Sequence, residues 1–204
     1  GPALRRAGRA AGGASGGGGA RTGGRTVGGA ACVRCVACGR CMSRGWLIVF
    51  AKAPRPGLVK TRMSPPLSLE QAAEFYAEML ADVLVASGRF ARELDLEPIL
   101  AFHPPDAARE LVHRTPPGFR LHAQRGSDLG ARMDHAAREA AAAGVGRILI
   151  RGSDSPTLEA VYLEEALARL DAGDDVVLTP DQDGGYATIG LRAPEPRLFR
   201  IEMS

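Results

Sequence analysis

The sequence predicts an α/β fold built on a mostly parallel sheet. Short apolar runs alternate along the chain with amphipathic helical patterns, which is the order expected of parallel strands joined by crossover helices. The run 148–150 is entirely apolar and follows Gly144, as is typical of a strand buried on both faces. Polar, glycine-containing segments follow several of these runs, at the strand ends where α/β sheets bind ligands.

The first 41 residues differ from the rest in composition. They hold 13 of the 26 glycines and seven arginines, but no Lys, Asp or Glu. We expect residues 1–41 to be a disordered tail, because such a segment cannot bury enough apolar surface to offset its chain entropy. Residues 42–204, the predicted domain, then hold 19 basic and 23 acidic residues, a formal charge of 19 − 23 = −4. They show no basic stripe, so we expect no nucleic-acid partner.

Four cysteines end this tail with the spacing C-x2-C-x2-C-x2-C: Cys32, Cys35, Cys38 and Cys41. Their thiolates offer the alternative of a non-catalytic metal-binding protein, although structural zinc sites usually separate two such pairs by a longer loop. We interpret Met42 as the natural start, with an extension or an artefact before it. The chain shows neither the apolar region of a signal peptide nor a membrane-spanning run, so we expect a cytoplasmic protein.

A basic loop follows the first predicted strand, residues 46–50. Four cations lie in it within a short stretch: Lys52, Arg55, Lys60 and Arg62. Converging positive charge just past a strand end suits a di- or triphosphate, and a solvated basic loop is the alternative. The loop is not a Walker A motif, because Val59 stands where that motif requires glycine.

The remaining elements alternate along the chain. Ser68 and Gln71 predict a capping box that begins a helix, which we expect to end at Gly88. Strands are predicted over 98–102, 119–123, 175–179 and 187–191, the last returning as a hairpin. Further helices are predicted over 106–113, from about 126 to 144, and over 157–170.

Two predicted strand ends carry carboxylates. Asp154 follows the strand at 148–150 among small residues, and Asp183 follows the strand at 175–179 and precedes Gly184 and Gly185. Neighbouring loops would thus offer Mg²⁺ or Mn²⁺ two carboxylates, and the glycines would leave room for a ligand. Ordinary turns are the alternative, since Asp, Ser and Gly are common turn residues.

A third site lies where a helix opens after the strand at 119–123. The glycine-containing start of this helix offers free N–H groups to an anion, and Arg132 lies one turn further on. Asp128 is either part of that site or only the N-cap of the helix. The four histidines of the chain show no metal-ligand spacing, and we assign them no role.

Four motifs occur in an order that resembles a known bacterial family. They are Phe50 to Arg62 (Phe-Ala-Lys-Ala-Pro-Arg-Pro-Gly-Leu-Val-Lys-Thr-Arg), Gly126 to Met133, Gly152 to Pro156, and Asp183 to Leu191. The order resembles GT-A-type transferases known as glycosyltransferases associated with radical-SAM, selenium or arsenosugar gene neighbourhoods. It is also similar to the phospho-acid guanylyltransferases of coenzyme F420 biosynthesis. The resemblance covers 46–204 and implies a three-layer, Rossmann-like nucleotide-diphospho-sugar transferase domain, apparently truncated at its C-terminus.

The resemblance implies a metal-dependent glycosyltransferase that takes a nucleotide sugar and a small-molecule acceptor. Asp154 and Asp183 are the expected catalytic and metal-binding residues, with Mg²⁺ or Mn²⁺ as cofactor. Asp183 is either a second metal contact or the base that takes the acceptor proton. A nucleotidyltransferase that uses a nucleoside triphosphate and releases pyrophosphate is the alternative. The expected nucleotide- or phosphate-binding residues are Lys52, Lys60, Arg62, Asp128, Arg132, Gly184 and Gly185.

Overall fold

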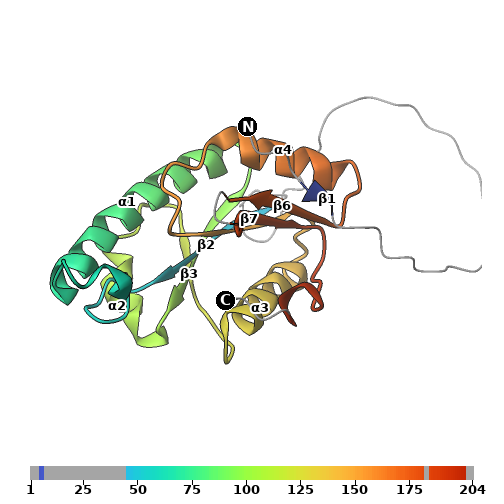
Figure 1. Cartoon of the computed structure of the whole chain (residues 1–204). Helices are drawn as coiled ribbons and strands as arrows, with labels where there is room; N and C mark the ends of the chain where they lie inside the picture. Colours follow the sequence, from blue (N-terminus) through green and yellow to red (C-terminus); the bar gives the residue numbers. More distant parts are fainter. Residues whose placement is uncertain (1–4, 7–44, 182–183, 201–204) are drawn as a thin grey trace, which may run out of the picture. The chain divides into compact units, whose positions relative to one another are not determined.

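The computed structural model describes residues 5–6, 45–181 and 184–200, which belong to one compact unit. Seven strands in this part of the chain form one sheet, in the order β1-β6-β7-β5-β2-β3-β4 (Figure 1). The strands are β1 (Arg5–Arg6), β2 (Trp46–Lys52), β3 (Glu97–His103), β4 (Arg120–Ala123), β5 (Ile148–Gly152), β6 (Val176–Pro180) and β7 (Tyr186–Leu191).

The prediction of a mostly parallel sheet is confirmed. Strands β4, β3, β2 and β5 are parallel neighbours. Strand β7 is antiparallel to both β5 and β6, so β6 runs in the same direction as β5, and the predicted hairpin return is also confirmed. The carboxyl ends of β2 to β6 therefore lie at one edge of the sheet, where ligands bind in this class of fold.

Strand β1 lies in the segment that the composition predicts to be disordered. Arg5 pairs with Leu178 and Arg6 with Val177, antiparallel to β6. The other residues of that segment, including the four cysteines, lie outside the described residues, as does Met42.

Helices cover both faces of the sheet and make three layers, as expected from the resemblance. Helices α1 (Leu69–Glu93), α2 (Ala108–Val112) and α4 (Ala160–Asp171) lie on one face, and α3 (Leu129–Ala142) lies on the other (Figure 1). Alternate strand residues supply the two cores: Leu47 and Leu149 pack with α1 and α4, whereas Ile48 and Ile150 pack with α3. Both faces of the central strands are therefore buried, which explains their uninterrupted apolar sequence.

Helix α1 begins as predicted but ends later. Ser68 accepts a hydrogen bond from the Gln71 N–H, and the Gln71 side chain accepts one from the Ser68 N–H, so the capping box is confirmed. The prediction that Gly88 ends the helix is wrong, because the helix continues to Glu93. A Cβ at Gly88 would lie 3.2 Å from a ring carbon of Phe119, so this glycine permits close packing inside the helix.

No helix among the described residues is long and apolar enough to cross a membrane.

Candidate functional site

A cleft of about 420 Å³ lies at the carboxyl ends of β2 and β5. This volume is within the usual range of small-molecule sites. Its apolar lining includes Phe50, Leu58, Val59 and Leu129. Its polar lining consists of Lys52, Lys60, Tyr76, Gln124, Arg132, Ser153 and Asp154. Four of the predicted site residues, Lys52, Lys60, Arg132 and Asp154, are thus brought together.

An ion pair joins the two loops that flank this cleft. Lys60 Nζ lies 2.8 Å from Asp154 Oδ1, and the two side chains are 25% and 71% exposed. Lys60 has a positive φ of 47°, a left-handed backbone conformation that residues other than glycine, Asn and Asp seldom adopt. Such strain is typical of functional sites, and here it accompanies the placement of an ammonium beside a carboxylate.

Two further cations, Lys52 and Arg132, line the cleft and form no ion pair with a carboxylate of the described residues, although the charge of Arg132 helps to lower the pKa of Asp128. Lys52 Nζ lies 3.5 Å from the Leu58 carbonyl, and Arg132 Nε donates to the Gly126 carbonyl at 3.2 Å. Burial lowers the pKa of His103, and the positive charges of Arg132 and Lys52 lower it further, so these three groups are near neighbours. The cleft lining therefore holds more cationic than anionic side chains, and an anionic ligand would be attracted to it.

The lysines are concentrated here. Lys52 and Lys60 are the only two lysines in a sequence that otherwise uses arginine for all its 24 remaining basic side chains. Both lie in the loop region after β2 and both line the cleft.

The fourth cation of this loop holds the loop in place. Arg55 Nη1 lies 2.9 Å from Asp106 Oδ2, and Arg55 Nε lies 3.0 Å from Glu110 Oε2. The hydrogen bonds that Arg55 donates to these carboxylates, the one to Asp106 first, raise the pKa of Arg55. Arg55 thus ties the loop to α2, and it does not line the cleft.

Asp128 caps helix α3. Its Oδ1 accepts a hydrogen bond from the Ala131 N–H at 2.8 Å, and its Oδ2 accepts one from the Ser127 hydroxyl at 2.8 Å. These bonds, chiefly the one from Ala131, lower the pKa of Asp128. The carboxylate is therefore engaged in capping, the alternative that the sequence left open, and it is not among the cleft-lining groups.

The other expected phosphate contacts lie elsewhere. Arg62 is exposed in a short 3-10 turn, residues 61–63, and does not line the cleft. Gly184 and Gly185 belong to the turn between β6 and β7, in which the Asp181 N–H donates to the Gly185 carbonyl at 3.0 Å. Asp183 lies outside the described residues.

Asp154 fits the kind of metal site that Mg²⁺ uses. Mg²⁺ is commonly held by one or two carboxylates together with waters and substrate phosphates. The Asp154 carboxylate is exposed at the cleft, and a cationic group, the Lys60 ammonium, already lies beside it. Among the described residues, no group of three or more His, Cys, Asp or Glu side chains is arranged to hold a metal. A metal ion at Asp154 would therefore take its other ligands mainly from waters and substrate oxygens.

Several cleft residues are absent from the sequence-based set. Gln124 Nε2 donates to the carbonyls of Ala101, at 2.8 Å, and Ala51, at 3.3 Å, and so joins the ends of β3 and β2. Tyr76 belongs to the apolar stripe of α1, where the pattern alone predicts only a core position. The one available signal was position: Gln124 follows a strand, and Ser153 precedes Asp154.

Comparisons with known proteins agree with this fold. The family model matching residues 85–204 is DUF2064, an uncharacterised protein conserved in bacteria. A solved structure from Desulfovibrio desulfuricans, named as a candidate nucleotide-diphospho-sugar transferase, has a TM-score of 0.70 and 33% identity over 78% of this chain and 69% of that one. A Leptospira borgpetersenii cytidylyltransferase has a TM-score of 0.47 and 14% identity over 76% of this chain and 62% of its own. No curated protein matches significantly. The fold is of the nucleotide-diphospho-sugar transferase type.

Proposed function

The chain belongs to the DUF2064 family of bacterial proteins, and we propose that it is a metal-dependent glycosyltransferase with a nucleotide-sugar donor. The observation that carries the proposal is the convergence of Lys52, Lys60 and Arg132 with Asp154 in one cleft at the carboxyl ends of the parallel strands. Similarity to a candidate nucleotide-diphospho-sugar transferase supports it. Three cations and one carboxylate suit a diphosphate that arrives with a divalent ion.

The cations would act most strongly as the sugar–phosphate bond breaks. Negative charge then builds on the leaving nucleoside diphosphate, and preorganised positive groups stabilise it more in the transition state than in the ground state. Lys52 and Arg132 form no ion pair with a carboxylate in the described part of the chain, so we assign them the initial capture of the diphosphate. Mg²⁺ or Mn²⁺ held by Asp154 would add positive charge at the same oxygens.

Lys60 has a different part in this proposal, because its ammonium is paired with the Asp154 carboxylate. Asp154 would hold a divalent ion, which would supply the positive charge that Lys60 now provides to the carboxylate. Lys60 would then be able to contact a phosphate oxygen at the cleft. Asp183 is proposed as a second metal contact or as the base for the acceptor.

A thermal-shift screen of the full chain tests the proposal. Nucleoside diphosphates, nucleoside triphosphates and nucleotide sugars are each added with and without Mg²⁺ or Mn²⁺, since a ligand that binds only the native state raises the melting temperature. We expect the largest metal-dependent rise with a nucleotide sugar. A rise selective for a triphosphate, followed by release of pyrophosphate in an assay, would instead establish nucleotidyl transfer. If no nucleotide changes the melting temperature, the proposal is wrong.

A further inference from the structure

A buried hydrogen-bonded chain lies beneath the cleft. The side chain of Tyr76 on α1 and that of Ser153 after β5 are joined by a hydrogen bond of 2.8 Å between their hydroxyl oxygens. The Lys52 backbone N–H donates to the same Tyr76 oxygen at 3.1 Å. Tyr76 is 3% exposed and Ser153 is 7% exposed, yet both contribute to the cleft lining. The chain thus runs from the end of β2 to the wall of the cleft.

Tyr76 takes its place because β5 is shorter than β2. The paired register of these two strands ends at Phe50 and Gly152. On the opposite side of β2, the Ala53 N–H still reaches the His103 carbonyl of β3 at 2.7 Å. The Lys52 N–H has no such strand carbonyl, and the phenolic oxygen of Tyr76 accepts it instead. The Lys52 N–H thus finds an acceptor where the pairing of β2 with β5 has ended.

The chain of hydrogen bonds has a direction. An N–H can only donate, so the Tyr76 oxygen is an acceptor towards Lys52. Burial raises the pKa of Tyr76, so the phenol keeps its proton at neutral pH. That buried proton needs an acceptor, and the Ser153 oxygen at 2.8 Å is the partner that the described residues supply. This favours Tyr76 as the donor to Ser153, an arrangement that leaves the Ser153 proton for an acceptor in the cleft.

We propose that Ser153 donates a hydrogen bond to an anionic diphosphate oxygen of the ligand. Tyr76 is a positioning residue in this proposal, because its hydrogen bond to Ser153 orients the serine hydroxyl as a donor towards the cleft. Each donor in the chain points its hydrogen towards the cleft, and successive hydrogen bonds of this kind strengthen one another. The last group is a donor, so it favours a partner that only accepts, such as a phosphate oxygen. This inference rests on the proposed function for the presence of a diphosphate.

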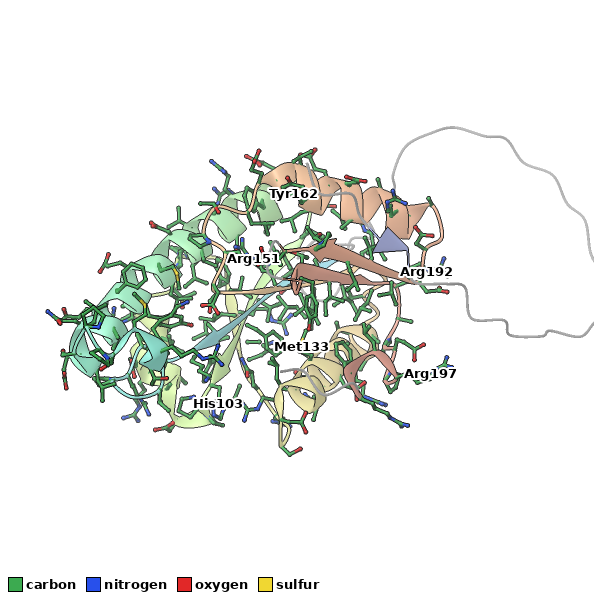
Figure 2. All side chains as sticks on the ribbon, in the orientation of Figure 1. His103, Met133, Arg151, Tyr162, Arg192 and Arg197 are labelled. Atoms are coloured by element: carbon green, nitrogen blue, oxygen red, sulfur yellow. The ribbon has the colours of Figure 1, made fainter. Side chains whose placement is uncertain are left out.

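The surrounding loop is fixed in a way that supports this role. Arg151, labelled in Figure 2, is 1% exposed and donates through Nη2 to the Ser155 carbonyl at 2.6 Å and through Nη1 to Ser87 Oγ at 3.2 Å. Tyr76 and Arg151 thus hold the residues on either side of Asp154. A group held in place before the ligand arrives loses less entropy on binding.

The first test compares two serines of this loop. Ser153→Ala removes the proposed donor, and Ser155→Ala is the matched control, because the Ser155 side chain makes no hydrogen bond in the described structure and does not line the cleft. The probe is inorganic pyrophosphate with Mg²⁺, titrated calorimetrically into the full chain. We expect Ser153→Ala to weaken binding about tenfold, the size of a hydrogen bond to a charged group, and Ser155→Ala to leave it unchanged. Equal affinity in the two variants would overturn the inference.

The second test separates positioning from general stability. Tyr76→Phe should weaken pyrophosphate binding in the parent chain but add nothing in the Ser153→Ala background, because the tyrosine acts through the serine. Tyr162→Phe on α4, also labelled in Figure 2, is the control for the same substitution. Equal loss in both backgrounds would mean that Tyr76 serves only the fold, and the positioning role would be wrong.

The outcomes also separate this inference from the function on which it rests. If the unmodified chain binds neither pyrophosphate nor any nucleotide, both proposals are wrong. If it binds them and the two serine variants do not differ, only the role of Ser153 is wrong.

Discussion

The tripeptide Gly-Ser-Asp occurs twice at the same edge of the sheet, at 126–128 and at 152–154, with different results. In the first copy the Ser127 hydroxyl donates to Asp128, and Asp128 caps a helix. In the second copy the serine is bonded to Tyr76, and the Asp154 carboxylate pairs with Lys60 across the cleft. The carboxylate of the first copy caps a helix, whereas the carboxylate of the second is exposed at the cleft.

The distance to the next helix accounts for the difference. Helix α3 begins at Leu129, directly after Asp128, so the free N–H groups of its first turn lie within reach of that carboxylate. Helix α4 begins only at Ala160, where Glu159 is the N-cap and makes no side-chain capping bond. Asp154 is therefore too far along the chain from any helix start to cap it. A carboxylate at a strand end becomes available when the following helix starts late.

The sharpest test of this comparison removes the charge of each aspartate at nearly constant volume. Asp154→Asn should lower the affinity for nucleotide in the presence of Mg²⁺ by at least about 100-fold. Loss of a residue that only hydrogen-bonds to a metal ligand typically lowers metal affinity by about 10 to 100-fold, and loss of the ligand itself should cost more. Asp128→Asn should leave nucleotide affinity unchanged, because Asn caps helices as well as Asp does. The affinities are compared by calorimetry at saturating Mg²⁺.

The melting temperatures of the two variants serve as the control. Asp154→Asn breaks only a partly exposed ion pair, and such pairs contribute about 0 to 1 kcal/mol, so the fold should survive. Metal-dependent binding of unchanged strength in this variant would contradict the role of Asp154. Equal losses in both variants would remove the distinction between the two copies.

A smaller effect is expected from Lys60, the cation paired with Asp154. Lys60→Ala should weaken nucleotide binding by about tenfold, the value of one charged hydrogen bond, and more at low salt than at high salt because screening reduces the Coulomb attraction. Arg62→Ala is the matched control, since Arg62 is exposed and lies outside the cleft lining. Equal losses from the two substitutions would mean that only the general charge of the loop matters.

Because the sequence has only two lysines, chemical labelling of lysine gives an independent test of the same contact. A lysine-directed acylating reagent can modify the side chains of Lys52 and Lys60 alone, besides the N-terminal amine. Nucleotide with Mg²⁺ should protect both lysines in a peptide mass-spectrometric assay. Protection of neither would place the ligand elsewhere.

Much of the fold follows from sequence because it depends on local patterns. Apolar runs, amphipathic stripes and the Ser68 capping box predict the strands and helices, since burial and capping act within a few residues. Gly88 misled the prediction of the end of α1. Its lack of a side chain accommodates the Phe119 ring, a contact between residues distant in the chain. The local sequence around Gly88 does not reveal that contact.

The site was only partly predictable for the same reason. Lys52, Lys60, Arg132 and Asp154 could be proposed because each follows a strand or opens a helix. The part played by Tyr76 depends on β5 ending before β2, and register of that kind is set by tertiary structure. Long-range hydrogen bonds therefore help to decide which loop residues line the cleft.

The smallest predicted effect concerns stability. Asp128→Ala should lower the melting temperature by a few degrees without changing nucleotide affinity, because the Ala131 N–H loses its acceptor. The pKa of Asp128 is lowered in the fold, so its stabilising contribution is present above the pKa of the unfolded chain and is lost as the pH falls through the native pKa. The difference in melting temperature from the parent should therefore shrink in acid. Asp128→Asn, which caps without ionising, should show no such dependence relative to Asp128→Ala. A nucleotide affinity that falls with Asp128→Ala but not with Asp128→Asn would mean that the cap also orients Arg132, and the two copies of the tripeptide would then serve one site.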